Sequence, residues 1–171
     1  MDSLTIEKLI DDKAVLSWLT PSQNEAFKQI QMFDSPAYKM INLYGKSGIG
    51  KGFIARFLIK ELGYSLCKTI AEDQWIKTES HFLIVDHVST SRESLRSIRN
   101  SMFRTQIERI LIISKTKADD DIPKITFELA KEDIEVFRSN LYKIGVKIPP
   151  DIEDVYDFNI LITKIGESYA K

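Results

Sequence analysis

The clearest chemistry lies in one glycine-rich run, Gly45-Lys46-Ser47-Gly48-Ile49-Gly50-Lys51-Gly52. Gly45, Gly50 and Lys51 fit the pattern G-x-x-x-x-G-K, and Phe53 follows. Glycines let consecutive backbone N–H groups turn inward around a phosphate, and a helix that begins near Lys51 adds its own N–H groups and dipole. The lysine supplies a positive charge for the outer phosphates. We therefore predict that residues 45–53 hold the phosphates of ATP or another nucleoside triphosphate, together with Mg²⁺.

One position departs from the expected phosphate-loop pattern. Gly52 stands where Ser or Thr would offer a hydroxyl to Mg²⁺. Nucleoside monophosphate kinases of the adenylate-kinase type also have glycine after the lysine, but they typically follow it with threonine, whereas Phe53 follows here. Because Mg²⁺ keeps several of its waters, a water can replace the missing hydroxyl. Nucleotide binding is therefore expected to survive, and fast hydrolysis is not.

Asp86 ends the apolar run His81–Asp86 and is the expected metal residue. A carboxylate at the carboxyl end of a central strand lies close to the phosphate loop and holds Mg²⁺ through its waters. Many hydrolysing ATPases place a glutamate directly after this acid, but here the next residue is His87. A histidine there either positions the attacking water as a catalytic residue or is an ordinary polar loop residue, and both readings stay open.

Two further sets of polar residues are candidates for the site. Ser114 and Thr116 follow the apolar run Arg109–Ser114, where a polar residue in AAA+-type ATPases senses the γ-phosphate; a simple turn is the alternative. Arginines crowd the preceding helix and its end: Arg92, Arg96, Arg99, Arg104 and Arg109. The first three are spaced to share one helix face. The arginines are either an ordinary solvated face or a contact surface for nucleic acid or an acidic partner. Alternatively, Arg104 or Arg109 is an arginine finger that reaches the nucleotide of a neighbouring subunit.

The elements that must position these residues alternate between strands and helices. Strands are expected at 38–44, 64–70, 81–86, 109–114 and 124–129, and helices at 22–33, 53–62, 91–103, 131–144 and 151–169. One or two short amphipathic helices are expected within 2–19, and 71–80 stays unassigned. Thr20 or Ser22 caps the helix that follows, and Glu25 stands three residues after Ser22, which is the spacing of a capping box. Strands separated by helices predict an α/β protein with a mostly parallel five-stranded sheet between two helical layers.

The order of strand, glycine loop, helix and apolar strand ending in aspartate resembles the P-loop NTPase superfamily. Within it the chain looks most like a small AAA+ or STAND-type ATPase module, on the strength of GKSGIGKG at 45–52 and HFLIVD at 81–86. The lead-in Thr20–Ala26 resembles that of such ATPases, where a glutamine touches the adenine, and 125–133 resembles the entry to a STAND lid. This resemblance implies a nucleotide-binding core over residues 1–130 and a reduced helical lid over 131–171.

Bulk composition limits the classes of partner. The 171 residues carry a formal net charge of −1, so no global field draws the chain to nucleic acid or to an anionic membrane. The single cysteine, Cys67, excludes an internal disulfide, and no apolar run approaches the length of a membrane span. These features, with no signal peptide at the N-terminus, lead us to expect a cytoplasmic protein without membrane contact.

Three functions remain open at this stage. The first is an ATP-binding module that self-assembles or docks on a larger partner, with weak or partner-dependent hydrolysis. The second is a phosphotransferase similar to nucleoside monophosphate kinases, which the Gly50-Lys51-Gly52 ending favours and the acids Asp119, Asp120 and Asp121 oppose. The third is a non-hydrolysing subunit of a DNA transaction or defence complex, which rests on fold-level analogy.

Overall fold

A computed structural model describes residues 1–86, 89–119, 121–150, 152 and 157–171. Within them, a five-stranded parallel sheet has the order β2-β3-β4-β1-β5. The strands are β1 (Met40–Tyr44), β2 (Ser65–Cys67), β3 (Phe82–Asp86), β4 (Arg109–Ser114) and β5 (Lys124–Thr126). The register pairs Tyr44 with Ser114 and Asp86 with Ile113. The phosphate loop, which follows β1, therefore leaves the sheet at the same edge as Asp86 and Ser114.

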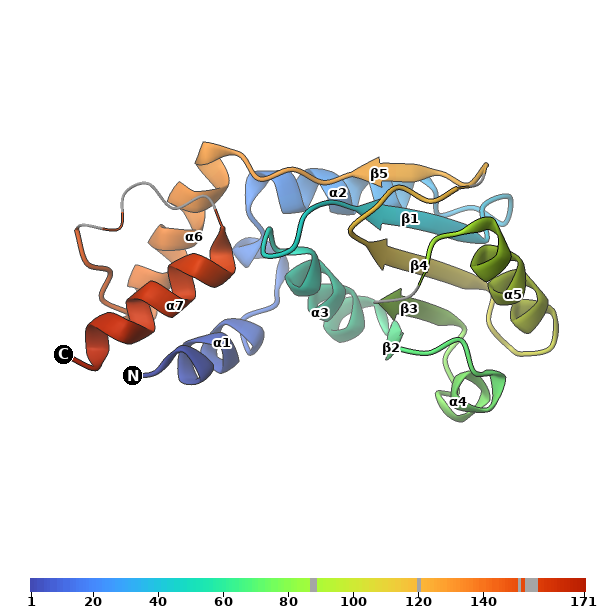
Figure 1. Cartoon of the computed structure of the whole chain (residues 1–171), viewed down its shortest axis with the longest axis horizontal. Coiled ribbons are helices and arrows are strands. Elements are labelled where there is room, and N and C mark those ends of the chain that lie inside the picture. The colour runs from blue at the N-terminus through green and yellow to red at the C-terminus, as the bar shows by residue number, and fades with distance from the viewer. Residues whose placement is uncertain (87–88, 120, 151, 153–156) are drawn as a thin grey trace.

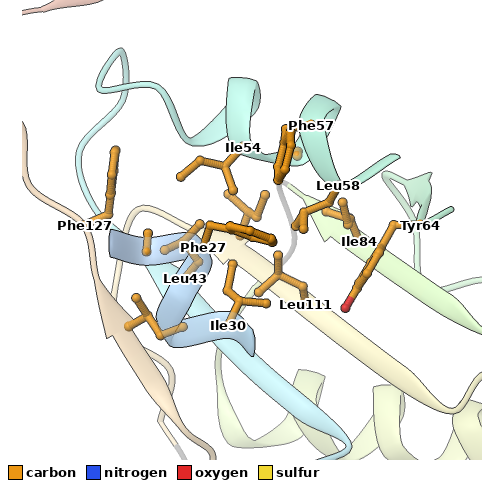
Figure 2. Close-up of a cluster of buried hydrophobic side chains, with 14 of the residues drawn as sticks. Phe27, Ile30, Leu43, Ile54, Phe57, Leu58, Tyr64, Ile84, Leu111 and Phe127 are labelled. Atoms are coloured by element: carbon orange, nitrogen blue, oxygen red, sulfur yellow. The ribbon is translucent and has the colours of Figure 1, made fainter. Parts of the chain in front are cut away.

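Helices α2 (Pro21–Met32) and α3 (Lys51–Leu62) cover one face of the sheet. Alternate strand residues such as Ile41, Leu43 and Leu111 point into this layer and are at most 1% exposed. Figure 2 shows Phe27 of α2 between these strands and Phe57 of α3; the two rings meet edge to face at 4.9 Å. A central parallel strand has to be apolar on both faces, which explains the unbroken apolar runs in the sequence.

Helices α4 (Glu72–Lys77) and α5 (Arg92–Phe103) cover the opposite face. Trp75 of α4 is fully buried there, and its indole N–H donates to the Thr69 carbonyl at 3.0 Å. Helix α5 starts beside the edge where Asp86 ends β3 and finishes beside Arg109, at the other edge of the sheet. The three layers confirm the predicted fold class (Figure 1).

A third hydrophobic cluster lies beyond the carboxyl edge of the sheet. It joins α1 (Ser3–Asp11) to α6 (Lys131–Lys143) and α7 (Phe158–Tyr169), and a short 3₁₀ turn, η1 (Leu16–Trp18), leads from α1 to α2. Figure 1 shows α1, α6 and α7 together at the end of the molecule that holds both chain termini. Phe53 and Leu129 contact both this cluster and the one beneath α2 and α3. The proposed division after residue 130 stays a prediction.

Two local expectations need correction, and one unassigned stretch contains a helix. Of the two caps expected for α2, the structure uses Thr20, and the capping-box partner is Gln23 in place of Glu25: the Gln23 Oε1 accepts from the Thr20 N–H at 2.9 Å. The last helix begins at Phe158, capped by Asp157, and does not begin at residue 151. The unassigned stretch 71–80 contains α4.

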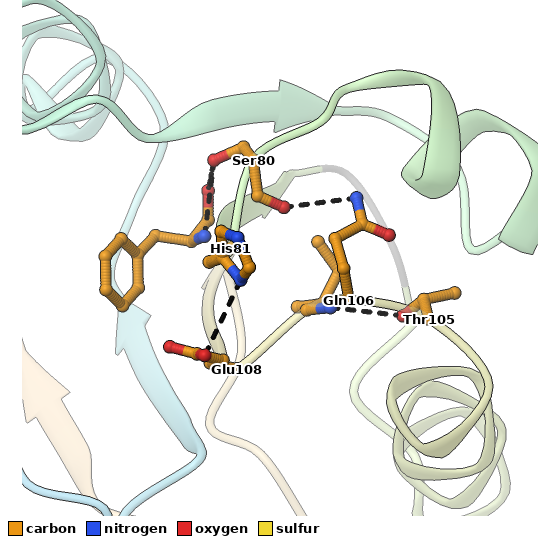
Figure 3. Close-up of polar contacts among 7 residues, drawn as sticks. Ser80, His81, Thr105, Gln106 and Glu108 are labelled. Carbon is orange, nitrogen blue, oxygen red and sulfur yellow. Dashed lines mark hydrogen bonds and ion pairs between the residues drawn. The ribbon is translucent and has the colours of Figure 1, made fainter.

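The amino edge of the sheet is fastened by polar contacts around β3 and β4 (Figure 3). The Gln106 side-chain amide donates to the carbonyls of Trp75 and Ser80, at 2.8 and 3.2 Å, and His81 Nδ1 lies 3.5 Å from Glu108 Oε1. His81 and Glu108 are more than half exposed and lie at the edge opposite Asp86. These polar residues therefore fix the strand starts and belong to no site with the phosphate loop.

Candidate nucleotide-binding site

A cavity of about 1120 Å³ opens at the carboxyl edge of the sheet, beside the phosphate loop. Among the residues that the sequence singled out, those that line this cavity are Ser47, Gly48, Gly50, Lys51, Gly52, Phe53, Asp86, Ser114 and Thr116. Gly45, Lys46 and Ile49 lie in the same loop but do not line the cavity. His87 lies outside the described residues. The four elements that position these residues are thus β1, α3, β3 and β4.

The backbone of the loop needs glycine at three positions. Gly48 and Gly50 have φ values of +77° and +96°, in the left-handed region that side chains disfavour. Gly45 has a different reason, because a Cβ there would overlap the Phe127 carbonyl. The Gly45 N–H donates to the Ser114 carbonyl at 3.1 Å, which fastens the start of the loop to the end of β4. The loop is therefore a constrained turn at the amino end of α3, as anion binding requires.

Lys51 is only 9% exposed and is held inside the loop. Its ammonium donates to the carbonyl of Gly45 and, at 2.9 Å, to that of Lys46. Burial lowers the pKa of Lys51, the nearby Asp86 carboxylate opposes that shift, and Lys115 adds to it. A bound anion stabilises a buried ammonium strongly, because burial has removed the water that would otherwise solvate its charge. This arrangement therefore fits phosphate groups at the loop.

The residues around Asp86 fit Mg²⁺ held largely by water and phosphate. Asp86 ends β3 on the cavity wall, close enough to Lys51 for their charges to interact. In the described part of the chain, no group of three or more His, Cys, Asp or Glu residues is arranged to hold a metal ion. Mg²⁺ suits such a place, because it binds through one or two carboxylates and otherwise through waters and substrate phosphates. Nothing lies within 4 Å of a Cβ built on Gly52, so there is room for a water where the hydroxyl is missing.

The Ser114 hydroxyl is already engaged in holding the loop after β4. It donates to the Thr116 carbonyl at 2.6 Å and accepts from the Asn42 side-chain amide at 2.9 Å. Asn42 is fully buried within β1, and its oxygen accepts from the Ala118 N–H. The Thr116 hydroxyl lies 3.3 Å from that of Thr90. Ser114 and Thr116 thus border the cavity; that either one senses a phosphate stays a prediction.

Gln23 is a site residue whose contact sequence reasoning missed. Its side chain is 2% exposed and bridges two backbones, accepting from Thr20 and donating to the Gly50 carbonyl at 3.1 Å. The adenine contact that the family resemblance implied for a glutamine therefore does not match the hydrogen bonds that Gln23 makes here. The available signal was its position three residues after Thr20, the capping-box spacing.

Helices α1 and α7 also border the cavity, which the sequence did not predict. Arg56 of α3 pairs with Asp11 of α1 at 2.7 Å. Burial raises the pKa of Asp11, and the charge of Arg56 partly offsets the shift. From α7, the Phe158 N–H donates to the Gly48 carbonyl at 2.8 Å. Local sequence patterns carry no signal for contacts of this kind, which join segments more than 40 residues apart.

The five arginines separate into two places, and Arg99 lies toward the amino edge, where it borders a second cavity together with Arg109. Arg92, at the start of α5, donates to the Asp119 carbonyl, and Arg96 is exposed one turn further along. Arg104 and Arg109 lie toward the amino edge, where they pair with Glu72 and Asp34 respectively. Arg109 is 12% exposed at its side chain and lies over the Phe82 ring. The structure therefore brings neither Arg104 nor Arg109 to the cavity of its own chain.

None of the described helices has the length and apolar character needed to cross a membrane. No protein-family model matches this chain, and no curated protein does so either. Solved structures do show a likeness. Domain III of the Thermotoga maritima replication initiation protein DnaA superposes with a TM-score of 0.56 at 13% identity, over 87% of this chain and 84% of that domain.

A structure described as a DNA replication initiation factor also has a TM-score of 0.56, at 14% identity over 85% of this chain. This chain spans 59% of that protein's length. Sequence identities this low support a comparison of the folds alone. The fold predicted from the sequence, a parallel five-stranded sheet with helices on both faces, is shared with these two replication initiation structures.

Proposed function

We propose that this protein binds ATP or another nucleoside triphosphate with Mg²⁺ at residues 45–53 and acts by nucleotide-dependent self-assembly or docking to a larger protein. The observation that carries the proposal is the convergence of the glycine loop, Lys51 and Asp86 on one cavity. A glycine-rich turn at the amino end of a helix, a buried ammonium and a nearby carboxylate are together the recognition set for a phosphate chain with its cation. The fold likeness to replication initiation proteins supports the same reading.

Each residue has a distinct part in binding. The backbone from Gly48 to Gly52 and the amino end of α3 surround a phosphate, while Lys51 exchanges its bonds to loop carbonyls for an outer phosphate. Asp86, on the cavity wall, would hold the cation through its waters. Bound Mg²⁺ would supply charge neutralisation across the phosphates. Phe53 packs beneath the loop between two hydrophobic clusters and keeps the first turn of α3 in place.

Weak or partner-dependent hydrolysis follows from two missing groups. Gly52 offers no hydroxyl, and the residue after Asp86 is a histidine where hydrolysing relatives place glutamate. Of the acidic residues of α1 that line the cavity, Asp11 is already paired with Arg56. A second copy or a partner protein would have to supply a group that orients the attacking water or stabilises the transition state.

A second proposal concerns DNA, which the descriptions of the two solved structures favour. Arg92 and Arg96 are exposed on α5 and offer a local basic surface on a chain with almost no net charge. We expect the double variant Arg92→Ala/Arg96→Ala to weaken DNA binding. The slope of log affinity against log salt concentration should become shallower by about one to two, because one counterion fewer is released for each lost phosphate contact. Salt-titrated fluorescence anisotropy with labelled DNA would measure this, with the exposed pair Lys77→Ala and Lys143→Ala as the control for charge loss.

Light scattering tests the assembly proposal directly. The molar mass of the wild type is measured without nucleotide, with ADP and with ATP, each with Mg²⁺ and each with and without a candidate DNA. A mass that rises with ATP in the wild type, and stays constant in Lys51→Ala, supports nucleotide-dependent assembly. A constant mass, together with transfer of phosphate to an added nucleoside monophosphate, would replace this proposal with the phosphotransferase.

A further inference from the structure

The first turn of α7 lies directly against the phosphate loop. The Phe158 N–H donates to the Gly48 carbonyl at 2.8 Å, and a Cβ on Gly48 would overlap both carboxylate oxygens of Asp157. The Phe158 ring is 5% exposed and lies against Gly50, where a Cβ would contact the ring edge. Figure 1 shows this end of α7 beside the turn between β1 and α3. Glycine at 48 and 50 therefore serves two needs, the left-handed backbone and the close approach of α7.

The Asp157 carboxylate is negatively charged, and a negative charge at this contact disfavours a bound phosphate. Asp157 places a carboxylate on the loop whose N–H groups and Lys51 are arranged for anions. A phosphate bound on the same loop would lie near that carboxylate, and like charges a few ångströms apart near a protein surface repel by roughly tenfold or more in affinity. The nucleotide and the observed position of Asp157 thus oppose one another.

We propose that Asp157 and Phe158 form a latch, the α7 latch, that holds the phosphate loop in its nucleotide-free state and must move when a nucleotide binds. This inference rests on the proposed function and adds its regulation. A ligand shifts a conformational equilibrium only when it binds one state better than the other, and the repulsion by Asp157 supplies that difference. The nucleotide selects the state in which the first turn of α7 has left Gly48.

Movement of the latch changes the surface that the protein presents. The Phe158 ring is packed 4.5 Å, centroid to centroid, from Phe137 of α6, within the cluster that joins α1, α6 and α7. Departure of the first turn of α7 from the loop uncovers part of this apolar pair beside the cavity. The latch therefore links occupancy of the phosphate loop to a change in the helical extension, which an assembly that responds to nucleotide requires.

A matched pair of variants separates the charge of Asp157 from its role in starting α7. Asp157 Oδ1 caps α7 by accepting from the Ile160 N–H at 3.0 Å, and asparagine caps a helix about as well as aspartate. Asp157→Asn therefore removes the charge and keeps the cap. Asp2→Asn is its control: Asp2 caps α1 by accepting from the Thr5 N–H, is exposed, and is outside the cavity lining.

The test uses the full chain with two measurements. Calorimetry with Mg²⁺ and ATP should give about tenfold tighter binding for Asp157→Asn than for the wild type, and an unchanged value for Asp2→Asn. Amide exchange followed by NMR should show the Phe158 N–H protected in the free protein and unprotected at saturating ATP.

The negative outcomes are distinguishable. Equal affinities of the wild type and Asp157→Asn, or a Phe158 amide that stays protected at saturating ATP, would overturn the latch and leave nucleotide binding standing. A Phe158 amide that is unprotected in the free protein would overturn it as well. Absence of binding by both proteins would remove the proposed function, and the latch with it.

Discussion

The side chain of Gln23 ties the first turn of α2 to Gly50, the residue that opens α3. Its amide nitrogen donates to the Gly50 carbonyl at 3.1 Å while its oxygen accepts from the Thr20 N–H. Gly50 has a φ of +96° and caps a helix that offers no side-chain cap of its own. Gln23 therefore couples the stability of α2 to the shape of the phosphate loop.

Gln23→Ala should reduce both stability and nucleotide binding. Loss of two buried hydrogen bonds, one of them a helix cap, should lower the free energy of unfolding by about 1–3 kcal/mol. A less constrained Gly50 should also weaken ATP binding several-fold. Urea denaturation and calorimetry measure the two effects. Gln29→Ala in the same helix is the control, because the Gln29 side-chain amide donates to the exposed Glu25 in an exposed hydrogen bond; equal effects of the two variants would contradict this role.

Much of the fold follows from the sequence, because strands buried on both faces leave unbroken apolar runs. The prediction for Arg109–Ser114 matches β4, and the glycine loop with Asp86 was correctly placed at one edge. Helix α4 was missed since it is short, polar and fixed by one buried residue, Trp75. The edge strands β2 and β5 are shorter than expected because pairing on one side alone supports fewer residues.

The parts of the site that escaped prediction all depend on distant packing. The contact of Phe158 with Gly48 spans about a hundred residues, and that of Gln23 with Gly50 depends on how α2 lies on the sheet. Periodicity and capping patterns report on neighbours in the chain and carry no information on such pairs. Asp157 shows the same limit, since a helix-capping aspartate is ordinary until the structure places it on the phosphate loop.

Two glycines of the loop should respond to alanine in opposite directions. Gly48→Ala forces a side chain onto a φ of +77° and into Asp157, and should destabilise the protein by about 1–3 kcal/mol. Gly52→Ala meets open space in the first turn of α3 and should stabilise it by about 0.5–1 kcal/mol. Thermal and urea unfolding of both variants provide the measurement. Destabilisation by Gly52→Ala would show that position 52 has a constraint beyond its backbone.

Gly52→Thr should restore a hydroxyl ligand for Mg²⁺. Space at this position is open, so the new side chain enters without displacing neighbours. The ratio of ATP affinity with Mg²⁺ to that without should rise several-fold relative to Gly52→Ala, which changes the helix propensity in the same direction but adds no oxygen. Calorimetry with and without a chelator gives both ratios. The same ratio in the two variants would place the cation away from residue 52.

Nucleotide affinity should fall as the pH rises into the alkaline range. Burial lowers the pKa of Lys51 below its ordinary 10.5, and phosphate binding needs the protonated ammonium. Between the lowered pKa and 10.5, Lys51 is less protonated in the folded protein than in the unfolded chain, so its contribution to the free energy of unfolding rises with pH in that window. Nucleotide affinity falls over the same window, because the ammonium is lost. ADP calorimetry from neutral pH to about pH 10 measures the affinity. A flat profile would mean that Lys51 keeps its proton throughout.

The central claim is that residues 45–53 hold the phosphates of a nucleotide, and calorimetry on three proteins tests it most directly. The wild type, Lys51→Ala and the exposed-lysine control Lys28→Ala are titrated with ATP and ADP, with and without Mg²⁺. The account predicts binding by the wild type and by Lys28→Ala, its loss in Lys51→Ala, and tighter binding when Mg²⁺ is present. Absence of binding by the wild type, or equal binding by Lys51→Ala, would contradict it.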